Sequence, residues 1–369
     1  MLNDRRAAIR SQADLLFERF KSEGALPVEA DSLQPAETLL DLYGEDIRAR
    51  AYVTFDPVEG EQMLRPDFTV PVVEMHMNEG AEPARYTYNG TVWRKQEAGS
   101  ARPSETLQVG FEIFDRENPE ASDAEVFALF SDILGGFDLR AATGDLGILI
   151  AAISGLKTID RRKAALLRHI WRPARFRQLL ERFQGLAEVP KSRADLLAAA
   201  AHTDVATLCQ KAGSHVGTRG LDEIAFRVEA LCEDAASAPI SSEEAAFLSA
   251  ILALRQKSDR ALLSLSDWAK DFSGIAPAVE RFERRLNALS AHGIDTSALD
   301  FEGSYGRTTL EYYDGFVFGF YAEKRPDLPV VASGGRYDAL TEVLGQGRSI
   351  PAVGGIIRPE ALVALQEGL

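Results

Sequence analysis

Two blocks of strand-like sequence enclose a long helical stretch, and this order limits the fold more than any single motif does. Residues 51–114 and 298–369 are rich in β-branched and aromatic residues, with glycine, proline and asparagine between the apolar runs. Residues 157–292 are instead rich in Ala, Leu, Glu and Lys, which are strong helix formers. The strand-like runs are joined by short connections, so the strands are expected to be mostly antiparallel. The pattern predicts an α+β protein in which both flanking blocks contribute to one sheet.

Helices are expected at both ends of the chain and after the first strand-like block. Apolar residues recur at helical spacing near the N-terminus, and a last helix is expected over 359–367. Ser122 and Glu125 have the spacing of a capping box, which predicts a helix over roughly 123–135. The apolar run of residues 146–156 could be a strand or a buried helix, because its periodicity does not distinguish the two.

Charge and cysteine content narrow the range of functions. The 369 residues include 41 Lys and Arg against 56 Asp and Glu, a formal net charge of −15. An acidic surface repels phosphate backbones, so no nucleic-acid partner is expected. Cys209 and Cys232 are isolated from each other and from the five scattered histidines, which predicts no metal site and a reducing compartment. The charged, periodic N-terminus is neither a signal peptide nor a membrane span. We therefore expect a cytoplasmic protein with no membrane partner.

Polar residues stand at alternate positions in the strand-like segments, where a plain core strand would not need them. Gln108 and Glu112 share one face of a strand, because strand side chains alternate. Asp67 and Thr69 share a face by the same rule, if QMLRPDFTVPVV is also a strand. Buried carboxylates are costly unless they are paired, so a ligand ammonium group would be a natural partner. The alternation predicts a pocket for a small, amine-bearing ligand.

Each of these residues also has an ordinary structural interpretation. Asp67 follows a proline and could be a turn or cap residue, and Glu112 could be solvated on an edge strand. The pair Tyr312–Tyr313, in the strand-like run LEYYDGFVFGFYAE, could be one core residue and one surface residue. The order and spacing of the segments therefore carry more information than any single residue.

Taken together, the segments resemble the catalytic core of the histidyl-tRNA synthetases, which are class II aminoacyl-tRNA synthetases. TFDPVEGEQMLRPDFT is similar to the family's strand pair ending in LRPE-x-T, and YTYNGTVWRKQEAGSARPSETLQVGFEIF resembles motif 2. LEYYDGFVFGF is similar to the histidine-specific block, and SGGRYDAL followed by PAVGG resembles the glycine loop and motif 3. The resemblance implies a class II synthetase-like core made of residues 1–156 and 293–369, a helical insertion subdomain over 157–292, and no anticodon-binding domain.

The resemblance also implies a histidine-binding site. Asp67 and Thr69 would bind the α-amino group, and Gln108 and Glu112 would add contacts to the amino acid. The imidazole end would be lined by Tyr312, Tyr313 and Tyr337. Arg94 and Arg102 of motif 2 are candidate phosphate contacts, with surface or interface salt bridges as the equally open alternative.

Two departures from the synthetase pattern remove cations that the reaction uses. The catalytic arginine of the histidine-specific block is Thr308 here, and the ATP-stacking arginine of motif 3 is Ala361. Preorganised positive charge is usually the largest single contribution to such a reaction, at about 10²–10³ in rate per donor. We therefore expect no catalytic residue and no cofactor.

A histidine pocket without adenylation residues resembles the regulatory subunits of ATP phosphoribosyltransferase. The resemblance implies a noncatalytic protein that assembles with the short-form catalytic subunit, activates it and delivers feedback inhibition by L-histidine, and that also self-dimerises within the hetero-oligomer. Residues 333–340 with the Tyr312–Tyr313 strand are the expected two-state element. Two alternatives stay open: a truncated synthetase-like enzyme that adenylates histidine or a related acid, and, less favoured by the charge, a nucleic-acid-binding module.

Overall fold

The chain forms two compact units. The computed structural model describes residues 2–43, 47–97, 99–100, 102–213, 217–307 and 312–368. The first unit comprises Met1–Ile148 and Ala253–Leu369, and the second comprises Leu149–Leu252. None of the described helices is both long and apolar enough to cross a membrane.

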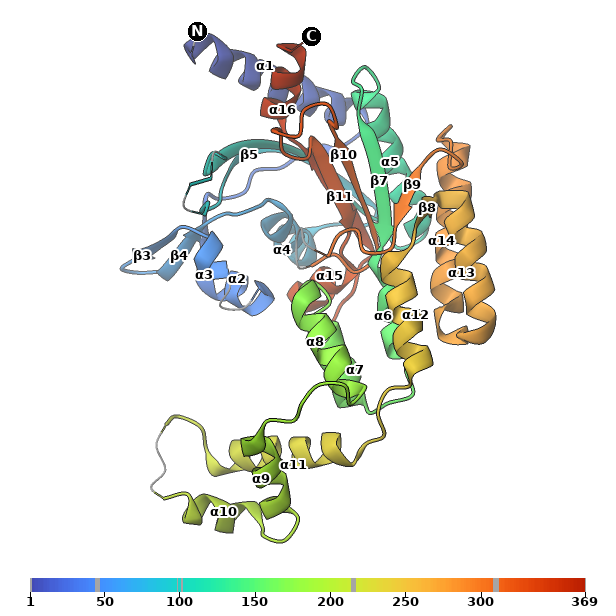
Figure 1. Cartoon of the computed structure of the whole chain (residues 1–369). Coiled ribbons are helices and arrows are strands. Elements are labelled where there is room, and N and C mark those ends of the chain that lie inside the picture. The colour runs from blue at the N-terminus through green and yellow to red at the C-terminus, as the bar shows by residue number, and fades with distance from the viewer. Residues whose placement is uncertain are drawn as a thin grey trace. The chain divides into compact units, whose positions relative to one another are not determined.

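Among the described residues, the first unit is built on a sheet of nine strands (Figure 1). In spatial order these are β1 (Leu26–Pro27), β5 (Ala84–Trp93), β6 (Glu105–Phe114), β12 (Ala352–Ile357), β11 (Ala332–Arg336), β10 (Phe316–Tyr321), β7 (Arg140–Asp145), β9 (Asp300–Glu302) and β8 (Arg255–Lys257). All neighbouring pairs are antiparallel except β1–β5 and β7–β9. The expected α+β fold with a mostly antiparallel sheet is therefore confirmed, with strands from both flanking blocks side by side.

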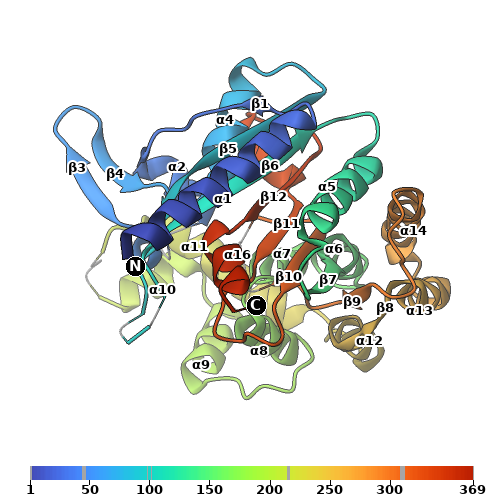
Figure 2. The same ribbon diagram turned by 90° about the horizontal axis from the view of Figure 1, so that it is seen from above.

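One face of this sheet carries the aromatic core beneath α1 (Leu2–Ser22) and α5 (Pro119–Leu134), and α1 runs along β5 and β6 in Figure 2. Phe20 of α1 lies 5.3 Å from Phe111 of β6, measured between ring centroids. Phe127 of α5 packs against Phe318 and Phe320 of β10 at 5.5 and 5.4 Å. Three further helices complete the outer layer of the unit: α13 (Ser258–Asp271), α14 (Ala276–Ala291) and α16 (Pro359–Gln366).

The opposite face of the sheet is covered by α4 (Thr69–Glu79) and α15 (Asp338–Leu344), which contact each other. A small antiparallel sheet lies in the same unit, in the order β2 (Leu33–Pro35), β4 (Gly60–Leu64), β3 (Val53–Asp56). The short helix α2 (Ala36–Tyr43) packs against this sheet, and α3 (Ile47–Arg50) contacts α2.

The second unit is helical. It contains α7 (Asp160–Arg168), α8 (Pro173–Phe183), α9 (Lys191–Ala200), α10 (Val205–Lys211) and α11 (Leu221–Ala236), with parts of α6 (Leu146–Ser154) and α12 (Ser242–Ala253). Arg162 ties α7 to α11, because its buried guanidinium donates to the Asp234 carboxylate at 2.6 Å. Periodicity left open whether residues 146–156 form a strand or a buried helix, and the structure shows helix α6 there.

The chain returns to the first unit at Ala253, whereas composition placed the end of the helical insertion at 292. Helices α13 and α14 pack in the first unit, where Arg285 of α14 donates to Asp123 of α5 at 2.8 Å. Composition predicts that a segment is helical, but it does not predict which of the two units the helix packs in. The end of the helical unit therefore lies at Leu252, earlier in the chain than composition placed it.

Two local predictions were wrong. Helix α5 begins at Pro119, because proline fits the first helical turn, and the Ser122 hydroxyl donates to the Asn118 carbonyl from inside the helix instead of capping it. The segment QMLRPDFTVPVV is not one strand, since β4 ends at Leu64 and α4 begins at Thr69. Pro71 lies in the first turn of α4, where its missing N–H costs nothing.

Candidate amino-acid binding site

Glu112 lies at the centre of the sheet face that α4 and α15 cover. Its strand, β6, is interior, with β5 on one side and β12 on the other, so the alternative of a solvated edge residue is wrong. Gln108, Gly110 and Glu112 alternate along one face of β6, as predicted from strand periodicity. The Glu112 side chain is 1% exposed. A carboxylate at this position needs partners that the protein or a ligand must supply.

Three hydroxyl groups surround the Glu112 carboxylate. Its Oε1 accepts from Thr69 Oγ1 at 3.2 Å and from the Tyr88 hydroxyl at 2.8 Å. Its Oε2 accepts from the Tyr337 hydroxyl at 2.6 Å. Among the described residues, Glu112 has no hydrogen bond or ion pair with a cationic side chain. The donors are all uncharged, so they stabilise the carboxylate by hydrogen bonds but do not neutralise its negative charge.

The environment of Glu112 disfavours its ionised form. Burial raises the pKa of Glu112 from 4.5 to about 7, and the negative charge of Asp67 adds to this effect. The hydrogen bonds from Tyr337, Tyr88 and Thr69 act in the opposite direction but do not cancel burial. A ligand cation placed beside Glu112 would favour the ionised form, because an opposite charge within a few ångströms lowers the pKa of a carboxyl group.

Glycines on neighbouring strands make the space that this arrangement needs. Gly354 of β12 is directly opposite Glu112, and a Cβ at that position would overlap Glu112 Oε2. A Cβ at Gly110 would overlap the ring of Tyr88. Close packing forbids such overlaps, so both positions require glycine while Glu112 and Tyr88 keep their places.

Asp67 and Thr69 reach the site from the start of α4 instead of from a strand. The Val70 N–H donates to Asp67 Oδ1 at 3.3 Å, which places the Asp67 carboxylate at the beginning of the helix. Asp67 is 5% exposed. The turn interpretation of Asp67 is therefore correct as local structure, and the same turn brings a second buried carboxylate toward Glu112.

The predicted tyrosines gather at the same place, although Tyr312 and Tyr313 lie in a loop before β10 and the strand expected for them was wrong. Their rings are 5.0 Å apart, and the Tyr312 ring is 6.0 Å from that of Tyr337. Both are 7% exposed, which also excludes the interpretation of one core and one surface residue. Burial, followed by the charges of Glu112 and Asp67, raises the pKa of Tyr313.

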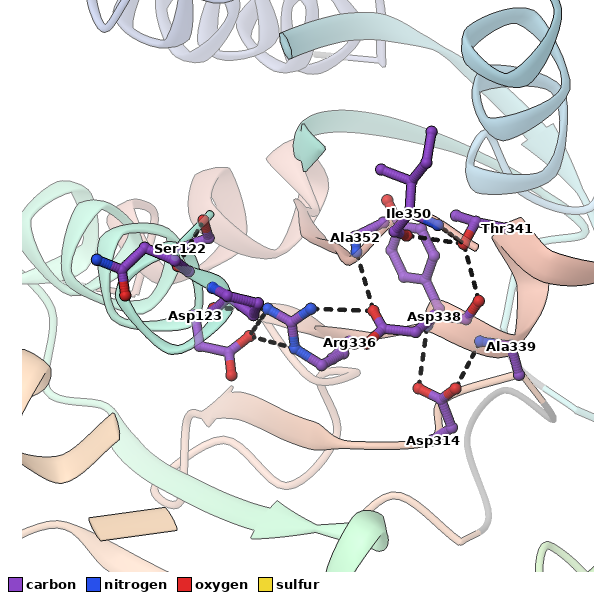
Figure 3. Close-up of polar contacts among 12 residues, drawn as sticks. Ser122, Asp123, Asp314, Arg336, Asp338, Ala339, Thr341, Ile350 and Ala352 are labelled. Carbon is purple, nitrogen blue, oxygen red and sulfur yellow. Dashed lines mark hydrogen bonds and ion pairs between the residues drawn. The ribbon is translucent and has the colours of Figure 1, made fainter. Parts of the chain in front are cut away.

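Asp314, the next residue in this loop, ties the tyrosines to α15. Its carboxylate accepts the N–H groups of Asp338 at 3.1 Å and Ala339 at 2.6 Å, and Figure 3 shows it beneath the start of the helix. Burial and the neighbouring charge of Asp338 raise the pKa of Asp314 to about 7. The loop, the end of β11 and the start of α15 are therefore one connected structure.

A buried arginine links this structure to the helical layer behind the sheet. Arg336, the last residue of β11, donates from Nε and Nη2 to Asp123 of α5 at 3.0 and 2.8 Å (Figure 3). Its Nη1 donates to Asp338 at 2.9 Å. Tyr337, which follows Arg336, points to the Glu112 side of the sheet. Any movement of Tyr337 would therefore act on a charged network that spans both layers.

The remaining predicted residues occupy different environments. Gln108 is 2% exposed, and its Oε1 has no hydrogen-bond partner in the part of the chain that the structure describes. Arg94 is half-buried and donates from Nε to the Pro66 carbonyl at 2.8 Å, whereas Arg102 is exposed in the segment between β5 and β6. Their assignment as phosphate contacts stays a prediction. Thr308 lies outside the described residues, and Ala361 is buried in α16.

Sequence reasoning missed two residues beside Glu112: Tyr88 and Gly354. Tyr88 could have been suspected from the alternating YTY run, but only the hairpin register places Tyr88 opposite Gly110 and so beside Glu112. Gly354 required knowledge that β12 pairs with β6 across more than two hundred residues. The pairing of β12 with β6 is not encoded in a local pattern.

Comparisons with known proteins agree with this geometry. The chain matches the family model described as histidyl-tRNA synthetase over residues 1–238 and 225–362. The ATP phosphoribosyltransferase regulatory subunit of Sinorhizobium medicae is 34% identical over 92% of this chain and 93% of its own length. That of Mesorhizobium japonicum is 31% identical over 94% of this chain and 95% of its own length.

Solved structures with the same fold have lower sequence identity. An ATP phosphoribosyltransferase regulatory subunit/histidyl-tRNA synthetase from Bacillus halodurans superposes with a TM-score of 0.67 at 20% identity, covering 98% of this chain and 79% of that chain. Histidyl-tRNA synthetase from Nostoc superposes with a TM-score of 0.63 at 16% identity, covering 99% and 73%. At such identities the likeness supports the fold alone, which is the class II synthetase-like architecture.

Proposed function

Because the chain belongs to the family of ATP phosphoribosyltransferase regulatory subunits, we propose that it binds L-histidine and regulates the catalytic subunit of that enzyme in histidine biosynthesis. The chain is a noncatalytic subunit of such a complex. It activates the short-form catalytic subunit when histidine is scarce. It lowers the activity of the complex when histidine binds, so that the pathway's end product limits its first step.

The ring of uncharged donors around Glu112 is the observation that carries the proposal. In its ionised form, a buried carboxylate with a second carboxylate nearby and, among the described residues, no cationic side chain bonded to it is stabilised when a positive group joins it. The α-ammonium group of an amino acid has the required charge and size. The tyrosines Tyr312, Tyr313 and Tyr337 supply an aromatic wall for an imidazole ring, and Asp67, Thr69 and Gln108 complete the proposed contacts.

The signal to the partner is proposed to start at Tyr337. Histidine bound at Glu112 competes for the oxygen that the Tyr337 hydroxyl contacts, and Tyr337 is joined to α15 and to the Asp314 loop. Residues 333–340 together with Tyr312–Tyr313 are then the two-state element. Coupling between two sites is typically about 1–3 kcal/mol, or 5–150-fold in affinity, and by linkage it acts equally in both directions.

The assembly is also part of the proposal. Phe55 and Val58 in the β3–β4 hairpin are 74% and 89% exposed, and Val53 on the edge strand β3 is 40% exposed. Exposed apolar side chains on an edge strand favour association, and a second copy of the chain is the proposed occupant. The two free, half-exposed cysteines, Cys209 and Cys232, support a reducing, cytoplasmic location.

The direct test mixes the purified chain with a short-form ATP phosphoribosyltransferase catalytic subunit and measures turnover with and without L-histidine. The proposal expects turnover to rise when the chain is added and to fall when histidine is added to the mixture. No change in turnover at any ratio would remove the proposal. Histidine-dependent exchange of pyrophosphate with ATP, measured on the chain alone, separates the adenylating alternative and is expected to be absent.

A further inference from the structure

The inference concerns Arg358, which lies just beyond β12, and it rests on the proposed function. In the pairing of β12 with β6, Gly354 is opposite Glu112 and Ile356 is opposite Gly110. Arg358 continues this alternation with extended backbone, at φ −100° and ψ 102°. The same register therefore brings Arg358 to the level of Gln108, on the sheet face that carries Glu112.

Within the described part of the chain, Arg358 has no anionic hydrogen-bond partner. Among the described residues its side chain makes one hydrogen bond, from Nη1 to the neutral Val330 carbonyl at 2.8 Å. The carboxylate of Glu360, whose charge acts on Arg358, accepts the Leu107 N–H at 2.7 Å. Burial and the like charge of Arg94 lower the pKa of Arg358 to about 10, while Tyr313, Glu360 and Tyr321 act in the opposite direction. The half-buried guanidinium is thus held beside a second cation, and no anion of the described residues is bonded to its Nε or its Nη2.

The two ends of this sheet face therefore have opposite charge. Glu112 and Asp67 make one end acidic, while Arg358 and Arg94 make the other end basic. Glu112 and Gln108 are four residues apart on β6, roughly 13 Å along the strand at about 3.3 Å per residue. A ligand in this interval would be reached by the long side chains of Glu112 and Arg358. Gln108 lies at the basic end of the interval, and its buried Oε1 has no partner among the residues that the structure describes.

We infer that Arg358 binds the carboxylate of the amino-acid ligand, so that the site recognises a zwitterion with its ammonium group toward Glu112 and its carboxylate toward Arg358. A guanidinium presents a planar fork of donors that matches a carboxylate. Free amino acids carry both charges, whereas amines and amino alcohols of the same shape carry only the positive one. Arg358 is then the residue that makes the site specific for the free acid.

Calorimetric titrations of the full chain with L-histidine, L-histidinol and histamine test this inference. Histidinol replaces the carboxylate by a hydroxymethyl group, and histamine has hydrogen in its place. The unsubstituted chain is expected to bind histidine at least 30-fold more tightly than either analogue. Arg358→Met is expected to weaken histidine binding alone and to reduce this preference below about 3-fold, while Arg358→Lys keeps part of it.

Arg255→Met is the matched control, because Arg255 is an exposed arginine on β8 at the far edge of the same sheet. It is expected to leave both affinity and preference unchanged. Equal binding of histidine and histidinol by the unsubstituted chain overturns the inference without any variant, even if Arg358→Met fails to fold. A folded Arg358→Met chain that keeps the full preference for histidine over histidinol and histamine also overturns the inference. If the unsubstituted chain does not bind histidine at all, the proposed function itself fails, which is a distinguishable result.

Discussion

The ionisation of Glu112 decides what the site can bind. In the free chain its pKa is about 7, so near neutral pH a large fraction of the chains hold a protonated Glu112. A ligand ammonium group binds the ionised form, because the protonated carboxyl group offers no charge to pair with it. Ligand binding is therefore coupled to the release of a proton. This coupling distinguishes an ammonium site from a site that only packs an imidazole ring.

We predict that the affinity for histidine increases as the pH is raised from 6 to 8, because Glu112 ionises in this interval. Calorimetry at pH 6 in two buffers of different ionisation enthalpy measures the protons released on binding. The release should be smaller in Glu112→Gln, which has no proton to lose at this position, and binding should be at least tenfold weaker. Equal proton release in both chains would show that the ligand's imidazole, and not Glu112, is the titrating group.

The same pKa has a consequence for stability without ligand. The folded chain keeps a proton on Glu112 that the unfolded chain loses from about pH 4.5 upward, so this group makes the fold less stable as the pH rises toward and through 7. A shift from 4.5 to about 7 corresponds to about 3 kcal/mol at most. Asp314 acts in the same direction, since its pKa is also raised to about 7.

Chemical denaturation at pH 5 and pH 8 measures this effect. We expect Glu112→Gln to lose less stability between these two pH values than the unsubstituted chain does. Asp314 is common to both chains, so its contribution cancels in the comparison. An identical loss in both chains would mean that Glu112 is ionised in the fold at both pH values.

At the scale of elements, the close approach of β12 to β6 depends on Gly354, which leaves room for the Glu112 carboxylate. We predict that Gly354→Ala weakens histidine binding at least tenfold, because the new Cβ overlaps Glu112 Oε2 and must displace it. Overpacking of this kind usually costs about 1–3 kcal/mol of stability. Gly136→Ala is the control, since a Cβ there meets nothing within 4 Å. Unchanged binding in the Gly354 variant would place the ligand elsewhere.

The junction of the Asp314 loop with α15 is a second element whose role can be isolated. Asp314→Ala removes the acceptor for two N–H groups at the start of the helix, and loss of such a cap costs about 0.5–2 kcal/mol. We predict that this variant binds histidine within a few-fold of the unsubstituted chain but transmits less inhibition to the catalytic subunit. Asp314→Asn, which keeps an acceptor oxygen, should retain most of the inhibition. Full inhibition in the alanine variant would exclude this junction as the route.

Some elements of the fold could be predicted locally and others could not. The hairpin of β5 and β6 follows from alternation, so the shared face of Gln108 and Glu112 was predictable. The start of α4 was not, because its valines favour strands while Pro71 and tertiary packing select a helix. The Tyr312–Tyr313 loop was missed for a related reason. An aromatic run suggests a strand, but here the next residue, Asp314, accepts N–H groups at the start of α15, and the segment is a loop. Gly354 and Arg358 required the long-range register of β12 against β6.

At the scale of the whole molecule, the account treats regulation as one equilibrium shared by the chain and its catalytic partner. In the proposed mechanism histidine binds more tightly to the inhibited state, so any substrate that favours the partner's active state must weaken histidine binding by the same factor. We expect this factor to be 5–150-fold, as is typical of coupled sites. Titrations of the assembled complex with and without the partner's substrates measure it. Equal affinities in the two titrations would show that histidine binding is not coupled to activity.

Calorimetric titration of L-histidine into the purified chain, alone and assembled with the catalytic subunit, tests the central claim most directly. The account predicts saturable binding at one site per chain, greatly weakened by Glu112→Gln and by Asp67→Ala in chains that remain folded. Absence of histidine binding to the unsubstituted chain in both titrations would contradict it, and so would full affinity in both variants.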